Sequence, residues 1–302
     1  MAQCKTSPEV GGMGHSVKRK EDPRFIRGQG NYVDDVVRPG MVFMDIVRSP
    51  YAHAKIKSIN TEKALAHPGV AAVITGETLK EYNLHMMPTL MSDTQMVLPI
   101  EKVCYQAQEV AAVIATDRYS AADGVELVEV EYEPLPVVVD PHKATDPDAP
   151  IIRDDKEGQE NNHIFHWEAG DKKGTDDIFK KADVVVKENI YLPRIHVASI
   201  ETCGCVSEFD SVSGQLTVWM TTQAPHAIRT VLALVAGHVG LREDKIRVIS
   251  PDIGGGFGGK VPVYPGYVIA IAASVVTGLP IKWIEDRREN LQADSFARDY
   301  HM

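Results

Sequence analysis

Residues 252–260 read DIGGGFGGK, and this stretch carries the strongest local signal in the chain. Five of the six residues from Gly254 to Gly259 are glycines, and only Phe257 interrupts them. Without Cβ atoms the backbone can adopt positive φ angles, and its N–H groups can approach a ligand closely. The stretch also follows an apolar segment that is typical of a strand. It therefore predicts a turn built for close contact with a ligand or with another part of the chain.

The interpretations of this turn differ in what contacts it. A phosphate-binding P-loop needs Ser or Thr after the lysine, whereas Val261 follows Lys260. A Rossmann fingerprint is matched only formally, because Pro262 and Pro265 stand where its helix should begin. A purely structural tight turn stays open. The interpretation that we favour is a cradle of backbone amides around a polar, phosphate-bearing cofactor, with Phe257 projecting into the site.

A second motif, TTQAPH over residues 221–226, lies where a strand gives way to an amphipathic helix. Pro225 suits the first turn of that helix, and free N–H groups at a helix N-terminus suit an oxyanion or a phosphate. Gln223 offers a donor and acceptors without a charge, so it can bond an oxo group without titrating. The alternative, that Gln223 and His226 merely cap the helix, is equally compatible with the residues.

The composition is that of a globular protein. Hydrophobic residues make up 44% and charged residues 25% of the 302 positions, which excludes disorder, collagen and coiled coil. No apolar run reaches the roughly 18 residues of a membrane span. The first ten residues, MAQCKTSPEV, lack the apolar segment of a secretory signal. A net charge of −10 without a basic block argues against nucleic acid as a partner.

The cysteines give no sign of a metal centre. Cys4, Cys104, Cys203 and Cys205 lack the spacing of zinc or iron–sulfur sites, so we expect no metal ligand in this chain. They indicate a reduced, cytoplasmic protein. The segment from Glu201 to Cys205 can hold a reactive thiolate or carboxylate, or place two small buried cysteines on a strand, and we favour the second interpretation.

The order of elements divides the chain into two patterned regions. We expect a mobile tail over residues 1–24, an α+β module over 25–142, a Pro-rich charged linker over 143–162 and a second α/β region over 163–302. Strand patterns fall at residues 41–49, 55–60, 70–75, 109–116, 129–134, 137–140, 163–171, 182–193, 204–210, 215–222, 245–250 and 280–287. Helix patterns fall at residues 61–68, 76–83, 118–128, 225–237 and 264–280. Residues 84–99, with four methionines and two prolines, are interpreted as a long loop.

Several stretches occur in one order along the chain. They are RKEDPRFIRGQGNYVDD (19–35), RSPYAHAKI (48–56), VEVEYEPLPVVVDP (128–141), TTQAPH (221–226) and DIGGGFGGK (252–260). In this order they resemble the molybdenum hydroxylases, the family of xanthine dehydrogenases and aldehyde oxidases, over almost the whole chain. MPTLMSDTQMVLP (87–99), residues 201–205 and ENLQADSFARDYHM (289–302) are similar to one branch of that family, the large, molybdenum-binding subunits of aerobic carbon monoxide dehydrogenases.

The resemblance implies a fold and a cofactor. Residues 25–142 would form an α/β hammerhead domain, and residues 163–302 would form the first part of a molybdopterin-binding domain. The cofactor would be molybdenum held by molybdopterin cytosine dinucleotide.

The resemblance also assigns cofactor-binding residues. Gln223 matches the family glutamine that hydrogen-bonds an oxo ligand on molybdenum. Gly256, Phe257 and Gly258 match the turn that sits over the metal and the pterin, and Gly255 belongs to the same cradle.

The reaction implied is oxidation of carbon monoxide with water to carbon dioxide. Electrons would pass to 2Fe-2S clusters and FAD on an iron–sulfur small subunit and an FAD-binding medium subunit, in a dimer of heterotrimers that can associate with the inner face of the membrane. The family's copper-holding cysteine and base glutamate would lie beyond Met302, so we expect no catalytic residue and no activity in this chain alone. The alternatives are hydroxylation of an aldehyde or N-heterocycle, and a truncated, non-catalytic scaffold subunit.

Overall fold

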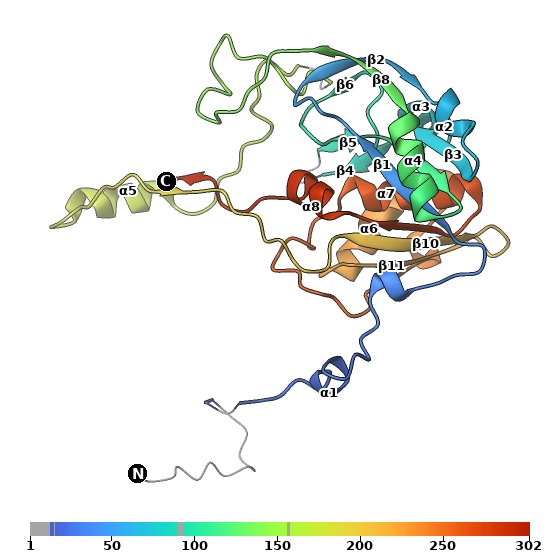
Figure 1. Cartoon of the computed structure of the whole chain (residues 1–302). Coiled ribbons are helices and arrows are strands. Elements are labelled where there is room, and N and C mark those ends of the chain that lie inside the picture. The colour runs from blue at the N-terminus through green and yellow to red at the C-terminus, as the bar shows by residue number, and fades with distance from the viewer. Residues whose placement is uncertain (1–12, 15, 90–92, 156–157) are drawn as a thin grey trace, which may run out of the picture.

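Strands from both patterned regions of the sequence meet in one mixed sheet (Figure 1). The computed structural model describes residues 13–14, 16–89, 93–155 and 158–302. Seven strands lie in the order β12-β11-β10-β13-β1-β7-β3. Their bounds are β1 Val42–Arg48, β3 Val70–Thr75, β7 Glu109–Ala115, β10 Gly204–Asp210, β11 Gln215–Met220, β12 Ile246–Ile249 and β13 Ile281–Ile284. The α+β class expected from the sequence is confirmed.

The junction between the two regions is a pair of strands. β1 lies parallel to β13, with Val42 opposite Ile281, and antiparallel to β7 on its other side. The N–H group of Val42 also donates to the carbonyl oxygen of Pro280 at 2.9 Å. Because β1 belongs to the first region and β13 to the second, backbone hydrogen bonds join the regions into one body.

Helices cover both faces of this sheet. They are α4 Arg118–Leu127, α6 Pro225–Ala236 and α7 Pro265–Thr277. All seven side chains of β7 are buried. Successive residues of a strand point to opposite faces of the sheet, so both faces of β7 must be covered. Ala111 and Val113 belong to the smaller cluster near α4, whereas Ala112 and Ile114 belong to the main core with α6 and α7. Burial on both faces explains the unbroken apolar run of this strand.

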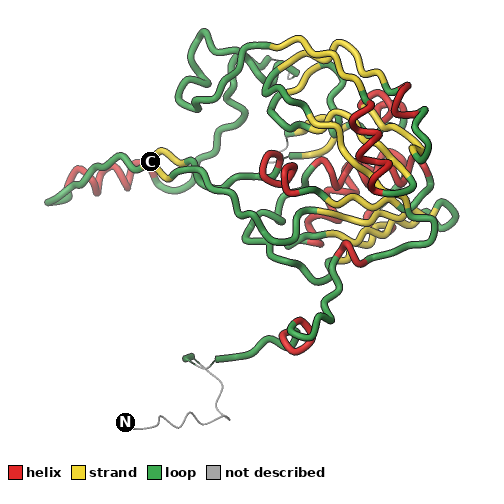
Figure 2. Tube along the Cα trace, viewed as in Figure 1, coloured by secondary structure: helices red, strands yellow, loops and turns green. Residues whose placement is uncertain are grey.

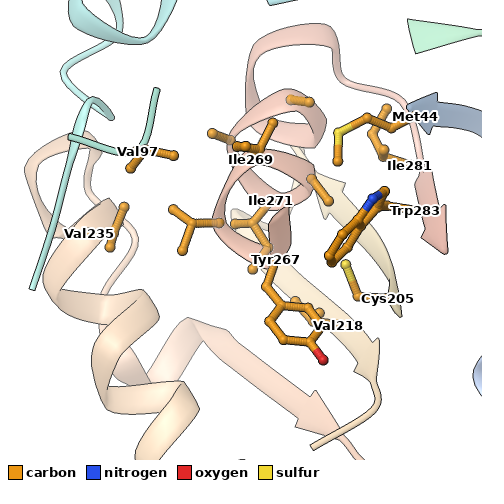
Figure 3. Close-up of a cluster of buried hydrophobic side chains, with 14 of the residues drawn as sticks. Met44, Val97, Cys205, Val218, Val235, Tyr267, Ile269, Ile271, Ile281 and Trp283 are labelled. Atoms are coloured by element: carbon orange, nitrogen blue, oxygen red, sulfur yellow. The ribbon is translucent and has the colours of Figure 1, made fainter. Parts of the chain in front are cut away.

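The main core centres on α7 and the strands that it covers (Figure 3). Tyr267 meets Trp283 of β13 edge to face, with ring centroids 5.5 Å apart. Cys205 of β10 is fully buried in the same cluster. Gly266 lets the helix approach the indole, since a Cβ atom there would lie 2.3 Å from Trp283 Cη2. The absent side chain therefore sets the distance between helix and sheet.

Three smaller sheets and several short helices complete the fold. The sheets are β6-β2-β8 (Lys102–Val103, Ala54–Asn60 and Glu129–Pro134), β4-β5 (Met86–Pro88 and Thr94–Met96) and β9-β14 (Tyr191–Leu192 and Tyr300–His301). The remaining α-helices are α1 Asp22–Phe25, α2 Glu62–Leu65, α3 Gly76–Glu81, α5 Lys172–Lys181 and α8 Arg287–Ala293. Short 3-10 turns lie at Val33–Asp35, Gly237–Val239 and Glu243–Lys245.

Several strand predictions are wrong. No strand forms at residues 137–140 or 163–171, and within 182–193 only β9 is a strand (Figure 2). A strand requires a hydrogen-bonded neighbour, and residues 183–189 have none among the described residues. Conversely, the loop expected over 84–99 contains the short hairpin β4-β5, of which residues 90–92 lie outside the described part.

Besides α1, the helices α5 and α8 were not predicted from the sequence. The strand expected over 280–287 ends at Ile284, because α8 begins directly after Asp286. The side chain of Asp286 accepts from the N–H group of Glu289 at 2.7 Å, and Glu289 accepts from that of Asp286, which forms a capping box. α5 begins after Asp171, which accepts from the N–H group of Gly174 at 2.9 Å. Local caps therefore determine both helices.

The described chain holds no helix that is long and apolar enough to cross a bilayer. Of the tail expected over residues 1–24, positions 1–12 and 15 lie outside the described residues. Its end is structured, because Asp22–Phe25 form α1 and the Arg24 guanidinium pairs with the Asp252 carboxylate. The tail and linker boundaries stay predictions.

Limited proteolysis tests the linker boundary. We expect the first cut within residues 143–162, whose side chains are mostly exposed. The two fragments should then co-elute in gel filtration, because β1 and β13 remain hydrogen-bonded. First cleavage within β7, or fragments that separate without denaturant, would contradict this arrangement.

Candidate cofactor-binding site

The glycine turn has a strained backbone. Gly255, Phe257 and Gly258 have φ angles of 101°, 51° and 92°, and Phe257 is the residue for which this left-handed conformation is costly. Its side chain is 75% exposed, so core packing does not compensate for the strain. Within the described chain, the N–H groups of Gly255, Gly256 and Phe257 have no acceptor. Successive free amides in such a turn form a concave site for anionic or oxo groups.

Gln223 is fixed against this turn. Its Oε1 accepts from the N–H groups of Gly258 at 3.0 Å and Lys260 at 3.3 Å. Its own N–H group donates to the carbonyl oxygen of Lys260 at 2.9 Å. A Cβ atom at Gly256 would lie 2.6 Å from Gln223 Cδ, so only glycine leaves room for this side chain. Gln223 and the glycine turn therefore lie in direct contact.

The orientation of the Gln223 amide follows from its partners. Both partners are N–H donors, so the oxygen must face them and the NH₂ group must lie on the other side of the planar amide. Nε2 has no partner among the residues that the structure describes, and the side chain is exposed. The group therefore presents a neutral donor beside the free amides of the turn.

An ion pair closes the base of the turn. Lys260 is 1% exposed, and its Nζ lies 2.9 Å from Glu201 Oε2. The same oxygen accepts from the N–H group of Gly254 at 2.7 Å. Glu201 thus ties the first residue of the turn to the last. Glu201 and Lys260 lie 59 positions apart, so no local pattern of the sequence indicates this role of Glu201.

The strands place these residues at one edge of the sheet. Gln223 follows β11, the glycine turn follows β12, and the two strands are parallel. Carboxyl ends of parallel strands meet at the same edge, where ligands collect in α/β folds. Ser250 strengthens the contact, because its Oγ donates to the carbonyl oxygen of Thr222 at 2.9 Å. This topology explains why two motifs distant in sequence come together.

The N-terminal segment also reaches the turn. Asp252 accepts from the Arg24 guanidinium and from the N–H group of Asn31, the latter at 2.8 Å. The bond from Arg24 is the main reason that the pKa of Asp252 is lowered from its usual value. The carboxylate therefore stays charged and anchors residues 24–31 beside the strand end.

A second polar cluster lies buried between the two regions. Cys203 Sγ lies 3.4 Å from Asp294 Oδ2, and Asn290 Nδ2 donates to Asp294 and to Glu285, the latter at 3.3 Å. Cys203, Glu285 and Asp294 could together hold a metal ion by their geometry, and the sequence analysis did not group them. Burial and then the charge of Asp294 raise the pKa of Glu285 to about 9.

The pKa of the Cys203 thiol is also raised, first by burial. The thiol is therefore protonated at neutral pH and is not a nucleophile. Cys205 is fully buried in the apolar core, as the favoured interpretation of this segment expected. Cys203 differs, because it contacts the carboxylate of Asp294.

Arg48 links this cluster to the first region. Its guanidinium lies 2.9 Å from Glu109 of β7 and 2.8 Å from Glu289 of α8. Glu285 lies farther away, at 3.7 Å. One cation therefore faces three buried carboxylates. Burial is the largest cause that raises the pKa of Glu285 and of Glu289, and the charge of Arg48 opposes it.

One cavity lies apart from the glycine turn and Gln223. It measures about 490 Å³ and is lined from the first region and the linker, with Gln95, Glu101, Cys104, Tyr105 and Arg153 among its walls. None of the residues predicted to bind cofactor lines it. The candidate site is instead formed by the free backbone amides of the turn and by the exposed side chain of Gln223.

Two family models together match most of the chain. The α/β hammerhead domain of aldehyde oxidase and xanthine dehydrogenase matches residues 27–136, and the molybdopterin cofactor-binding domain matches residues 155–302. The chain therefore belongs to the aldehyde oxidase and xanthine dehydrogenase family of molybdenum hydroxylases.

Individual relatives indicate which members of this family the chain is similar to. The carbon monoxide dehydrogenase large chain of Afipia carboxidovorans is 59% identical over 300 residues, which is 96% of this chain and 37% of the relative. The corresponding chain of Hydrogenophaga pseudoflava is 55% identical over 302 residues, again 37% of its length. A crystal structure of copper- and molybdenum-containing carbon monoxide dehydrogenase, in the carbon monoxide-reduced state, has a TM-score of 0.89 at 57% identity and covers 98% of this chain and 38% of that chain.

A double-mutant cycle tests the Glu201–Lys260 pair. Glu201→Gln should lower the free energy of unfolding by about 3 kcal/mol, because it leaves a buried ammonium without its counter-charge. Adding Lys260→Met should recover part of this loss, with a coupling energy of about 1–3 kcal/mol in urea unfolding. Glu243→Gln is the matched control, since Glu243 pairs with Arg229 on the surface at 3.1 Å. The effect of this control on the free energy of unfolding should stay below about 1 kcal/mol. If the effects of Glu201→Gln and Lys260→Met simply add, Glu201 and Lys260 do not act together as a clamp on the turn.

The protonated Glu285 predicts a pH dependence of stability. Its pKa is raised in the folded state, so between about pH 5 and pH 8 the folded chain holds a proton that the unfolded chain has lost. The free energy of unfolding should therefore fall as pH rises, by at most ~1.4 kcal/mol per pH unit for one proton. Glu285→Gln should flatten this dependence in urea titrations at pH 5.5, 7 and 8 with reductant present. Parallel curves for the two proteins would show that Glu285 is ionised in the folded state.

Proposed function

We propose that the chain forms one wall of the molybdenum site in a carbon monoxide dehydrogenase large subunit, with Gln223 and the glycine turn facing the cofactor. This proposal rests on the side-chain amide of Gln223, which two backbone N–H groups fix in one orientation. Its oxygen is occupied by the turn, which leaves the NH₂ group as a neutral donor at an open surface. The similarity to carbon monoxide dehydrogenase large chains supports the assignment.

The residues present fit a molybdopterin cofactor. Gly256 leaves room for the Gln223 side chain to lie against the turn, and the N–H groups from Gly255 to Phe257 lack acceptors within the described chain. Neutral donors suit an oxo-metal centre and its pterin, because a charged side chain would add a desolvation cost. In this proposal Gln223 Nε2 would donate a hydrogen bond to the metal centre, and the turn would hold the pterin of a molybdopterin cytosine dinucleotide.

When bound, the cofactor supplies the two-electron oxidation of carbon monoxide with oxygen from water, as cofactors generally carry the difficult chemistry. The residues of this chain would position the cofactor and shield it from water. Gln223 orients one ligand by its NH₂ group, and the clamp of Glu201 and Lys260 keeps the turn in place. The exposed ring of Phe257 can cover the site and keep water from its near side.

The rest of the enzyme is part of the same proposal. The chain spans about 37% of the length of its relatives, and the resemblance assigns the copper cysteine and the base glutamate to no residue of it. We therefore expect activity only with further polypeptide of the large subunit. An FAD-binding medium subunit and a 2Fe-2S small subunit would take the electrons, in a cytoplasmic dimer of heterotrimers.

The experiment is to produce this chain with the remaining large-subunit polypeptide and both partner subunits in a host that makes the cofactor. We expect about one molybdenum per large subunit, release of CMP on acid hydrolysis, and carbon monoxide-dependent dye reduction. Gly256→Ala should lower that reduction at least about tenfold, because the methyl group displaces Gln223, and tenfold corresponds to ~1.4 kcal/mol of lost transition-state stabilisation.

The matched control is Gly237→Ala, where a Cβ atom meets nothing within 4 Å and activity should be unchanged. Absence of molybdenum from the assembled wild type would refute the cofactor proposal. Molybdenum with hydroxylation of an N-heterocycle or aldehyde, and none of carbon monoxide, would refute only the substrate. Equal activity of the Gly256 and Gly237 variants would show that Gln223 is not part of the cofactor site.

A further inference from the structure

The glycine turn lies against a second segment of the chain. We call residues 197–201 the floor, because three alternate side chains of this segment contact glycines of the turn. The pairs are Val197 with Gly259, Ser199 with Gly255 and Glu201 with Gly254, and a Cβ atom at each glycine would lie 2.7, 3.2 and 2.6 Å from the nearest atom of its partner side chain. Since an added side chain would meet the floor, the glycines let the turn lie close against it.

Hydrogen bonds also join the floor to the turn. The N–H group of Glu201 donates to the carbonyl oxygen of Gly254 at 3.2 Å. In return, the side-chain Oε2 of Glu201 accepts from the N–H group of Gly254 at 2.7 Å. A shift of the floor would therefore break contacts with the first residue of the turn. The direction of the free amides that follow Gly254 depends on where the floor lies.

The backbone of the floor is not regular structure. Residues 197–201 belong to no helix or strand, so no ladder of backbone hydrogen bonds holds them. Ala198 has a φ angle of 41°, a left-handed conformation that costs energy for a residue with a Cβ atom. Ser199 is buried, whereas its neighbour Ile200 is exposed. Contacts from another part of the chain must therefore keep this backbone in place.

Arg287 of α8 supplies such contacts. Its Nη2 donates to the carbonyl oxygens of Ser199 at 2.7 Å and Ile200 at 2.8 Å. Its Nη1 donates to Asn290 Oδ1 at 2.7 Å. A guanidinium is planar and carries its donors in a fixed fork, so these three bonds determine its orientation as well as its position. The fork thus holds the two carbonyl groups that directly precede Glu201.

Asn290 gives the Arg287 guanidinium a fixed base. Asn290 is buried, and its Nδ2 donates to carboxyl groups of the buried polar cluster, which directs its Oδ1 toward Arg287. The same helix contacts the first region, because Glu289 lies 2.8 Å from the Arg48 guanidinium. α8 therefore connects the buried ionic cluster to the floor, and through the floor to the glycine turn.

We propose that Arg287 is a positioning residue for the candidate cofactor site, and that it acts through the floor to keep the glycine turn in its binding geometry. The inference rests on the proposed function for what the turn binds, but not for how the turn is held. Free amides bind an anionic or oxo group best when they already point at it, because binding otherwise has to order them. Without Arg287, the turn should become more mobile while the sheet stays folded.

Amide hydrogen exchange of this chain, measured by NMR without cofactor, tests how the turn is held. Arg287→Met removes all three hydrogen bonds of the guanidinium and keeps an unbranched side chain. The N–H groups of Glu201 and Gly254 should then exchange at least about tenfold faster, because the floor and the turn open locally. The N–H groups of β7, which pair with β1 and β3, should keep their exchange rates.

Arg288→Met is the matched control. Arg288 is the next residue of α8 and is exposed, and its side chain makes no hydrogen bond or ion pair with the residues that the structure describes. This variant should exchange like the wild type throughout. Two results would overturn the proposal: unchanged exchange at Glu201 and Gly254 in Arg287→Met, or an equal increase at β7, which would mean that Arg287 only stabilises the whole fold.

Metal analysis of the assembled enzyme tests the consequence for the cofactor. When the chain is produced with the rest of the large subunit and both partner subunits, Arg287→Met should hold at most about a third of the molybdenum that Arg288→Met holds, because a mobile turn binds less tightly. Equal molybdenum in the two assembled variants would overturn the positioning role. Absence of molybdenum from the wild type would instead refute the proposed function, and the exchange rates would still decide whether Arg287 holds the turn.

Discussion

The parallel pairing of β1 with β13 is the contact on which the rest of the molecule depends. Through it, Val42 and Ile281 bring a hammerhead strand into the sheet that carries the candidate site. β7 and β3 continue that sheet on one side, and β10 to β12 continue it on the other. Arg48 at the end of β1 also pairs with Glu289 of α8, so the buried ionic cluster spans the same junction. Stability and site geometry therefore share one junction.

The candidate site depends on that sheet in a simple way. The parallel strands β11 and β12 end at the same edge, so the segments that leave them must run side by side. One segment contributes the neutral amide of Gln223. The other contributes glycine residues, whose lack of side chains lets the backbone approach that amide. The buried pair Glu201–Lys260 supports the strained turn from below. The strain at Phe257 is thus held by surrounding structure, as is common at functional sites.

Short-range signals in the sequence were sufficient for much of this. The glycine run predicted a turn suited to close contact, and Pro225 predicted the start of the helix that follows Gln223. Contacts between distant residues were not accessible in the same way. Nothing in the local pattern pairs Glu201 with Lys260, or β1 with β13. The helix α8 did have a local signal, the capping box of Asp286 and Glu289, which the apolar run before it obscured. The valine run before β9 has strand propensity, but it has no hydrogen-bonded neighbour among the described residues, and propensity alone does not form a sheet.

The same strand pairing constrains the order of events during synthesis. Val42 and Ile281 are separated by some 240 residues, and a ribosome adds about 5–20 residues each second. One edge of β1 therefore waits roughly 10–50 s for its neighbour after it has emerged, even though β7 can close the other edge much earlier. During that interval an apolar strand edge is open to other nascent chains. The nascent chain is therefore most exposed to wrong pairing after the hammerhead strands have emerged from the ribosome and before β13 has been made.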